Sequence, residues 1–228
     1  MKRIFLFLSA VSALCLVGGC AELSGQTKDL QASRSTAKSL SPKDELDEQR
    51  MEEAVRGLVF DAGLIRVPNS KNDRIAGERL RVKADRSIEE ENVWFHSVGY
   101  FRDALLADAN NYKTYEGLAR AFLMEGEASR AEPALRTALQ MQPKFSAARY
   151  ELGLVRQMLS DYAGAVSQWK ILTQHDPNYS DVYARMAIAS YYDQDFDGAK
   201  RYLAEADRRH QNVPPQFRGL LQEAVSRQ

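Results

Sequence analysis

The sequence contains very little cysteine and histidine, and this scarcity argues against several kinds of chemistry. Its two cysteines, Cys15 and Cys20, both lie near the N-terminus, so the rest of the chain has no thiol for a disulfide or a metal site. The three histidines are scattered and lack the spacing of a metal-binding pair. No phosphate-binding loop or nucleophile elbow occurs. We therefore expect no catalytic residues, no metal, no cofactor and no enzyme activity.

An excess of one charge sign is also missing, because 31 lysines and arginines balance 31 aspartates and glutamates. Nucleic-acid-binding domains usually carry a basic surplus, so we expect no nucleic-acid partner. The apolar run at residues 4–17 is shorter than the roughly 20 residues that a membrane-spanning helix needs. Without disulfides, the stability of the chain must come from packed helices.

The N-terminus has the layout of an export signal. Two basic residues precede the apolar run, and the small-residue segment Val17–Cys20 follows it. This segment resembles the bacterial lipobox. The resemblance implies a lipoprotein signal peptide at 1–19, a covalent lipid such as palmitate on Cys20, and, with Ala21 next, a lipid-anchored place on the periplasmic face of a Gram-negative outer membrane. An ordinary secretory signal or an uncleaved anchor is the alternative.

Six residue classes recur at a spacing of 34 in the second half of the chain. The columns are Tyr115, Arg149 and Tyr183; Leu118, Leu152 and Met186; Ala119, Gly153 and Ala187; Ala131, Ala165 and Ala199; Leu135, Trp169 and Leu203; and Pro143 and Pro177. Each unit has two amphipathic stretches, which predicts a helical hairpin. The tiny residues allow two helix backbones to approach closely. Asp161 and Asp195 stand where helix N-caps are expected.

This pattern resembles the tetratricopeptide repeat (TPR). The resemblance implies an all-α fold, namely a right-handed solenoid of helical hairpins with N-terminal helices and a C-terminal capping helix, and a role in binding proteins. The expected domains are the signal peptide, a flexible tether at 20–40, an N-terminal helical segment at 41–87 and a TPR domain at 88–228. Within the TPR domain we expect a half repeat at 88–111, repeats at 112–145, 146–179 and 180–213, and a capping helix at 214–228.

The segments before the repeats are predicted from composition and capping signals. Ser41 and Pro42 predict a helix that closes near Gly63, and residues 75–84 suit a short helix. Ser87 followed three residues later by a glutamate predicts a capping box at the start of the next helix. We interpret that helix as the second half of a degenerate leading repeat.

In TPR arrays the first helix of each hairpin lines a concave groove. Transferred by position, the partner-binding residues are Lys113, Glu116, Arg120, Met124, Tyr150, Leu154, Met158, Asp181, Ile188, Tyr191 and Tyr192. The family's basic clamp for a C-terminal carboxylate is mostly missing here. The tyrosines and methionines suit an apolar peptide or an amphipathic helix of a partner. We expect Tyr150, Leu154, Ile188 and Tyr192 to form one exposed patch. The alternative is that Tyr191, Tyr192 and Met158 simply pack against neighbouring helices.

A lipidated and tethered TPR chain resembles the lipoproteins that help to assemble envelope machines. It is similar in size and layout to tight-adherence (Tad) pilus assembly lipoproteins and to the pilotins of type IV pilus secretins. The resemblance implies an outer-membrane scaffold for assembly of a pilus or secretion system, with an envelope protein or peptide as its partner. The alternatives are a periplasmic adaptor for peptidoglycan enzymes or outer-membrane protein assembly, and a regulatory subunit of an envelope enzyme.

Overall fold

The computed structural model describes the backbone of residues 42–90 and 94–227. The predicted signal peptide, Cys20 and the tether lie outside the described residues. The chain divides into two units, residues 1–44 and 45–228, and the fold described below is that of the second unit. Within the described ranges, no helix is both long and apolar enough to span a membrane.

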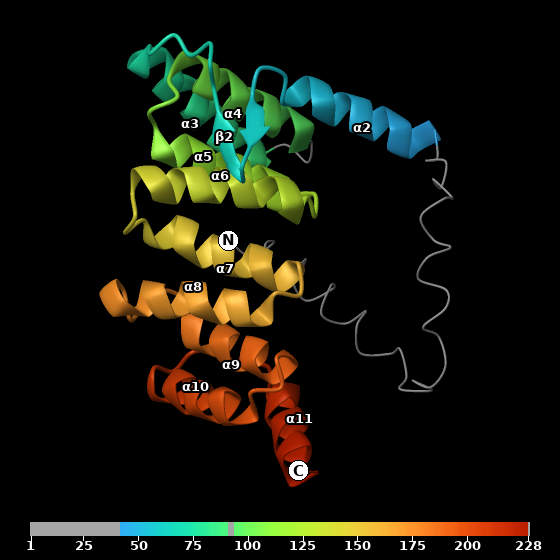
Figure 1. The fold of residues 1–228 in the computed structure, drawn as a ribbon, viewed down its shortest axis with the longest axis vertical. Coiled ribbons are helices and arrows are strands. Elements are labelled where there is room, and N and C mark those ends of the chain that lie inside the picture. Colours follow the sequence, from blue (N-terminus) through green and yellow to red (C-terminus); the bar gives the residue numbers. More distant parts are fainter. Residues whose placement is uncertain (1–41, 91–93, 228) are drawn as a thin grey trace. The chain divides into compact units, whose positions relative to one another are not determined.

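The described residues form ten helices and two short strands. In chain order they are α2 (Pro42–Ala54), β1 (Val59–Asp61), β2 (Leu64–Arg66), α3 (Arg74–Glu90), α4 (Trp94–Ala107), α5 (Tyr112–Met124), α6 (Ala128–Met141), α7 (Ser146–Met158), α8 (Tyr162–His175), α9 (Val182–Tyr192), α10 (Phe196–Arg208) and α11 (Pro215–Ser226). From α3 to α10 the helices pair as successive hairpins, and each hairpin contacts the next (Figure 1). The fold is an all-α solenoid of TPR-like helical hairpins, as the sequence predicts.

The tiny residues of the repeat lie where helices touch. Ala131 and Ala165 are fully buried. At Gly153, an added Cβ atom would lie 2.2 Å from the indole Nε1 of Trp169, far inside van der Waals contact. Trp169 is itself fully buried, and its Nε1–H donates a hydrogen bond to the backbone oxygen of Tyr150 at 3.0 Å. The tiny and bulky columns are therefore complementary shapes at the contact between α7 and α8.

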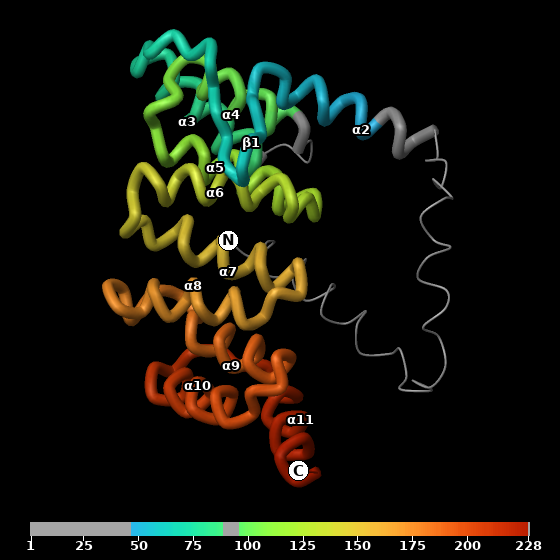
Figure 2. The backbone as a smooth tube through the Cα atoms, viewed as in Figure 1, coloured from blue at the N-terminus to red at the C-terminus, as the bar shows by residue number. Residues whose placement is uncertain are grey.

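The turns within the hairpins also repeat. Gly126, Ser160 and Gln194 are 34 residues apart, and their φ angles are +78°, +62° and +64°. The chain then enters the second helix through Asp161 or Asp195, whose carboxylates accept hydrogen bonds from backbone N–H groups at 2.9 and 2.8 Å. The two predicted N-caps are confirmed. Figure 2 shows the resulting sharp reversals of the backbone between the paired helices.

The leading hairpin differs from the prediction. Its first helix, α3, runs from Arg74 to Glu90, and α4 begins only at Trp94. Ser87 does not start a helix: it is buried inside α3, and its Oγ donates to the backbone oxygen of Ala84 at 2.8 Å and shares a hydrogen bond with Ser97 Oγ at 2.6 Å. The predicted capping box is therefore wrong, and the domain boundary expected at residue 88 falls within α3.

The leading hairpin is complete, so the array begins one helix earlier than the sequence indicated. Arg81 and Asp85 lie 34 residues before Tyr115 and Ala119, in the aromatic and tiny columns of the repeat. Their side chains pair with each other. Because these charged residues replace the two most recognisable columns, the repeat pattern is hidden in α3.

The segment after α2 also differs from the prediction, because α2 ends at Ala54 and a β-hairpin follows it. β1 and β2 pair antiparallel with Phe60 opposite Ile65, and Gly63 lies in the turn with a φ of +74°. Ile65 is buried, and its N–H donates to Thr137 Oγ1 on α6 at 2.8 Å. Gly63 therefore turns a β-hairpin rather than ending a helix, and the hairpin is held against α6.

The C-terminal helix covers the end of the stack. On α11, Phe217 and Leu221 are buried against residues of α9 and α10. Pro214 and Pro215 precede this contact and fix the start of the helix. The helix therefore shields the apolar side of the last hairpin from water, as a capping helix does.

Candidate functional site

The predicted groove residues all lie on, or at the N-terminus of, the first helices of the hairpins. Lys113 and three apolar residues are exposed: Met124 by 55%, Met158 by 47% and Tyr192 by 45%. The other predicted residues are half-buried, namely Glu116, Arg120, Tyr150, Leu154, Asp181, Ile188 and Tyr191. The predicted groove residues are therefore partly surface residues and partly packing residues.

The three exposed apolar residues occupy one repeat position. Met124, Met158 and Tyr192 are 34 residues apart, and each is the last residue of α5, α7 or α9. Tyr192 also stacks on Tyr162, with ring centroids 5.4 Å apart. We call Met124, Met158 and Tyr192 the apolar row. It presents large apolar side chains to solvent in three consecutive repeats, a feature typical of interaction surfaces.

The expected exposed patch does not form, because three of its four residues pack inward. Tyr150 lies against Trp169 and Tyr179, with ring centroids 6.4 and 5.3 Å away, and its O–H donates to Asp181. Burial raises the pKa of the Tyr150 phenol. The chain that leads into α9 covers this ring, which sequence spacing does not reveal.

Leu154 and Ile188, the other two inward residues of that patch, belong to the packing between repeats. Leu154 packs against the apolar cluster of α8 and α9, and Ile188 against that of α10 and α11. Tyr191 makes an edge contact with Phe217 at 5.6 Å, which ties α9 to the capping helix. Leu154, Ile188 and Tyr191 are therefore packing residues, and Tyr192 is the exposed member of the patch.

Ion pairs between charged side chains connect α3 with α5. Arg120 donates from Nη2 to Asp85 Oδ1 at 2.7 Å, and its Nε lies 3.3 Å from Glu116 Oε1. Arg81 pairs with the same Asp85. These groups largely neutralise one another, and half-buried charges of this kind need such partners. They therefore hold adjacent hairpins together.

Glu116 and Glu151 form a carboxyl pair between α5 and α7. Desolvation raises the pKa of Glu151 well above its ordinary value, and the charge of Glu116 adds to this effect. The pKa of Glu116 is raised as well, mainly by desolvation and against the attraction of Arg120. Two buried carboxylates this close cannot both ionise easily, so the pair retains a proton more tightly than in water.

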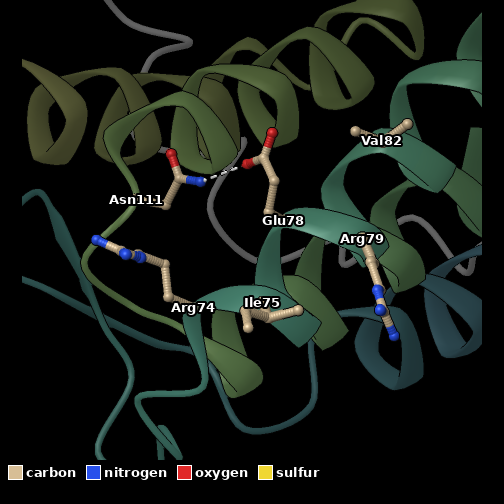
Figure 3. A pocket seen from close by; sticks show the side chains of 6 residues that line it. All are labelled: Arg74, Ile75, Glu78, Arg79, Val82 and Asn111. Atoms are coloured by element: carbon tan, nitrogen blue, oxygen red, sulfur yellow. Dashed lines mark hydrogen bonds between the residues drawn. The ribbon is translucent and has the colours of Figure 1, made fainter.

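A pocket of about 630 Å³ lies beside α3, at the first hairpin (Figure 3). Ile75, which is 68% exposed, and Val82 form its apolar part, next to Arg79. Asn111 donates to Glu78 at 3.0 Å across it. The sequence prediction missed this pocket because α3 was not recognised as a repeat helix. The signal that could have indicated it is the 34-residue spacing between Val82 and Glu116, which places Val82 at a predicted groove position.

The arrangement offers surfaces suited to binding. In the described part of the chain, no group of three or more histidine, cysteine, aspartate or glutamate side chains is placed to hold a metal ion. The polar side chains between the first helices are occupied with one another, as shown for Arg120 and Tyr150. The apolar row and the α3 pocket are surfaces that a partner could contact.

No protein-family model matches the chain, and no curated protein matches its sequence. Solved structures match its fold. PilF from Pseudomonas aeruginosa aligns with a TM-score of 0.57 and 19% identity, over 69% of this chain and 71% of that one. A MamA protein aligns with a TM-score of 0.55 and 20% identity, over 58% and 72%. The first TPR of Spaghetti (RPAP3), bound to the HSP90 peptide SRMEEVD, aligns with a TM-score of 0.51 and 15% identity, over 54% and 96%. At these identities the likeness shows the TPR fold.

Proposed function

We propose that this protein is a lipid-anchored outer-membrane scaffold that binds protein partners and takes part in assembling a pilus or secretion system. The observation that carries the binding role is the apolar row. Met124, Met158 and Tyr192 recur on three adjacent hairpins of a TPR-like stack, and their exposed fractions are 55%, 47% and 45%. Burying such side chains against a partner is favourable because it removes apolar surface from water.

The periplasmic setting of the proposal comes from the N-terminal sequence. A lipobox-like segment ending at Cys20 and a small, polar segment at 20–40 suit a chain that is anchored by lipid and reaches away from the membrane. The same layout resembles pilus assembly lipoproteins and secretin pilotins, and PilF of Pseudomonas aeruginosa is among the similar folds. These likenesses support a pilus or secretion machine as the place of action.

A complementation experiment tests the proposal. In a strain lacking this protein, surface pili or secreted substrate are measured after expression of the wild type, of the triple variant Met124→Ser, Met158→Ser, Tyr192→Ser, or of a control triple variant. The control changes three exposed residues that lie on the second helices of the same three hairpins and line neither pocket, Ser129→Ala, Gln174→Ser and Arg208→Ser.

We expect the wild type and the control to restore the machine and the apolar-row variant to fail, with equal protein levels and equal melting temperatures. Normal pili and secretion in the strain without this protein would contradict the assembly role. Restoration by the apolar-row variant would contradict the binding surface while leaving the assembly role intact.

A further inference from the structure

A second pocket, of about 440 Å³, lies between the turn of the β-hairpin and helices α6, α7 and α8. It is separate from the apolar row and from the α3 pocket. Three of its lining residues are arginines, Arg136, Arg149 and Arg156, and none of its lining residues is acidic. Such a concentration of guanidinium groups needs either compensating carboxylates nearby or an anionic ligand.

Arg149 stands at a position that the neighbouring repeats fill with an aromatic residue. Its equivalents are Tyr115, which is buried, and Tyr183. An aromatic ring at this place closes the space between the helices of a hairpin. Arginine leaves a charged group there instead, and Gln168 on α8 faces it at 3.1 Å. The pocket therefore exists where the repeat pattern is broken.

The guanidinium of Arg149 forms hydrogen bonds with neutral groups only. Its Nη1 donates to Gln168 Oε1, and its Nη2 donates to the backbone oxygen of Pro143 at 2.7 Å. Its Nε is buried without a hydrogen-bond partner, and desolvation lowers its pKa. Within the described ranges, no carboxylate lies within ion-pair distance of this guanidinium. A carboxylate brought into the pocket would supply the missing countercharge.

The other two arginines share carboxylates that lie outside the pocket lining. Arg136 and Arg156 approach the same Glu132 oxygen at 3.8 and 3.7 Å, which is long for an ion pair. Arg156 also pairs with Asp161 at 3.2 Å, while Asp161 caps α8. These two carboxylates pair with Arg136 and Arg156 only, so the three guanidinium groups keep a positive excess at Arg149.

We propose that this pocket binds an acidic side chain, aspartate or glutamate, on a segment of a protein partner. The guanidinium fork matches a carboxylate with two parallel hydrogen bonds. A volume of about 440 Å³ is in the usual range for an organic ligand group and has room for a side chain with its adjoining backbone, more than a single inorganic ion needs. Gln140 and Gln168 line the same space and can bond to the peptide backbone. The protein nature of the occupant rests on the proposed scaffold function.

The test uses the full-length chain in detergent, with ¹⁵N-labelled arginine side chains observed by nuclear magnetic resonance. It is titrated with the acetylated and amidated tripeptide Glu-Leu-Glu, with the matched tripeptide Gln-Leu-Gln, and with inorganic phosphate. We expect saturable shifts of the Arg136, Arg149 and Arg156 Nε–H signals with the glutamate peptide only. Because Arg149 would form a hydrogen-bonded ion pair with a glutamate carboxylate of the peptide, Arg149→Tyr should weaken this binding at least about tenfold.

Further variants separate a loss of peptide binding from a loss of folding. Arg149→Tyr returns the aromatic residue of the column and should keep the melting temperature. If it does not, Arg136→Gln, at a partly exposed side chain, provides the test. Arg201→Gln on α10, at an exposed arginine outside the pocket, should bind normally. Equal shifts with the glutamine peptide, tighter binding of phosphate, or unchanged affinity in the pocket variants would overturn the proposal. The apolar-row variant should bind the glutamate peptide normally, so failure of this site and failure of the scaffold function are distinguishable.

Discussion

Replacing Gly153 with alanine should weaken the contact between α7 and α8 at the centre of the stack. The new Cβ atom would lie 2.2 Å from Nε1 and 2.3 Å from Cε2 of Trp169. The indole cannot simply rotate away, because it is fully buried and its N–H is bonded to the backbone oxygen of Tyr150. Either the two helices separate or the buried N–H loses its acceptor.

The magnitude follows from three opposing effects. Alanine gains about 1 kcal/mol over glycine through helix propensity. Overpacking of a well-packed core costs about 1–3 kcal/mol. Leaving a buried donor unpaired costs about 1–3 kcal/mol more. The free energy of unfolding should therefore fall by about 1–5 kcal/mol, and the melting temperature by roughly 2–20 °C for a chain of this size.

The assay is thermal unfolding followed by circular dichroism, with two other helical glycines as controls. Gly99 on α4 and Gly219 on α11 have no atom within 4 Å of an added Cβ. Gly99→Ala and Gly219→Ala should therefore leave stability unchanged or raise it by up to about 1 kcal/mol. If Gly153→Ala melts at the same temperature as these controls, the close approach of α7 and α8 described above is refuted.

Three further changes test other parts of the structure. Ser160→Gly and Gln194→Gly should each raise the free energy of unfolding in urea by about 0.5–1 kcal/mol, because both residues occupy the left-handed backbone region that favours glycine; no gain would argue against these turns. Glu151→Gln should raise stability at pH 8 relative to the wild type and leave it similar near pH 4. The reason is that a carboxyl pKa raised by folding makes the folded state bind more protons, so that stability is lost as pH rises above the ordinary glutamate pKa of 4.5; parallel pH profiles for the two proteins would refute the buried carboxyl pair. Cys20→Ser should abolish incorporation of labelled palmitate and release the protein from membranes, and continued labelling would refute the lipid anchor.

The sequence alone was enough to predict the regular part of the stack. The 34-residue columns reflect contacts between helices that are near neighbours in the chain, so small or bulky residues of the same class return at each contact. Asp161 and Asp195 were recognisable for the same reason, because an N-cap acts on N–H groups two or three residues away. Such local rules carry over from one repeat to the next.

The tertiary structure alone decided the features that depend on residues far apart in the chain. Helix α3 was not recognised as a repeat helix, because Arg81 and Asp85 fill two repeat columns and pair with each other, and Asp85 also pairs with Arg120 on the next hairpin. Whether Tyr150 is exposed depends on the segment leading into α9, which covers its ring.

Of the candidate sites, the sequence predicted residues of the apolar row and none of the arginine pocket. The members of the apolar row were all predicted as groove residues, but the sequence did not separate them from the buried ones beside them. The arginine pocket was not predictable, because its lining comes from a β-hairpin and three helices that only folding brings together. A repeat pattern specifies which neighbours pack, whereas burial and charge compensation are properties of the whole surrounding surface, and these decide which side chains are left for a partner.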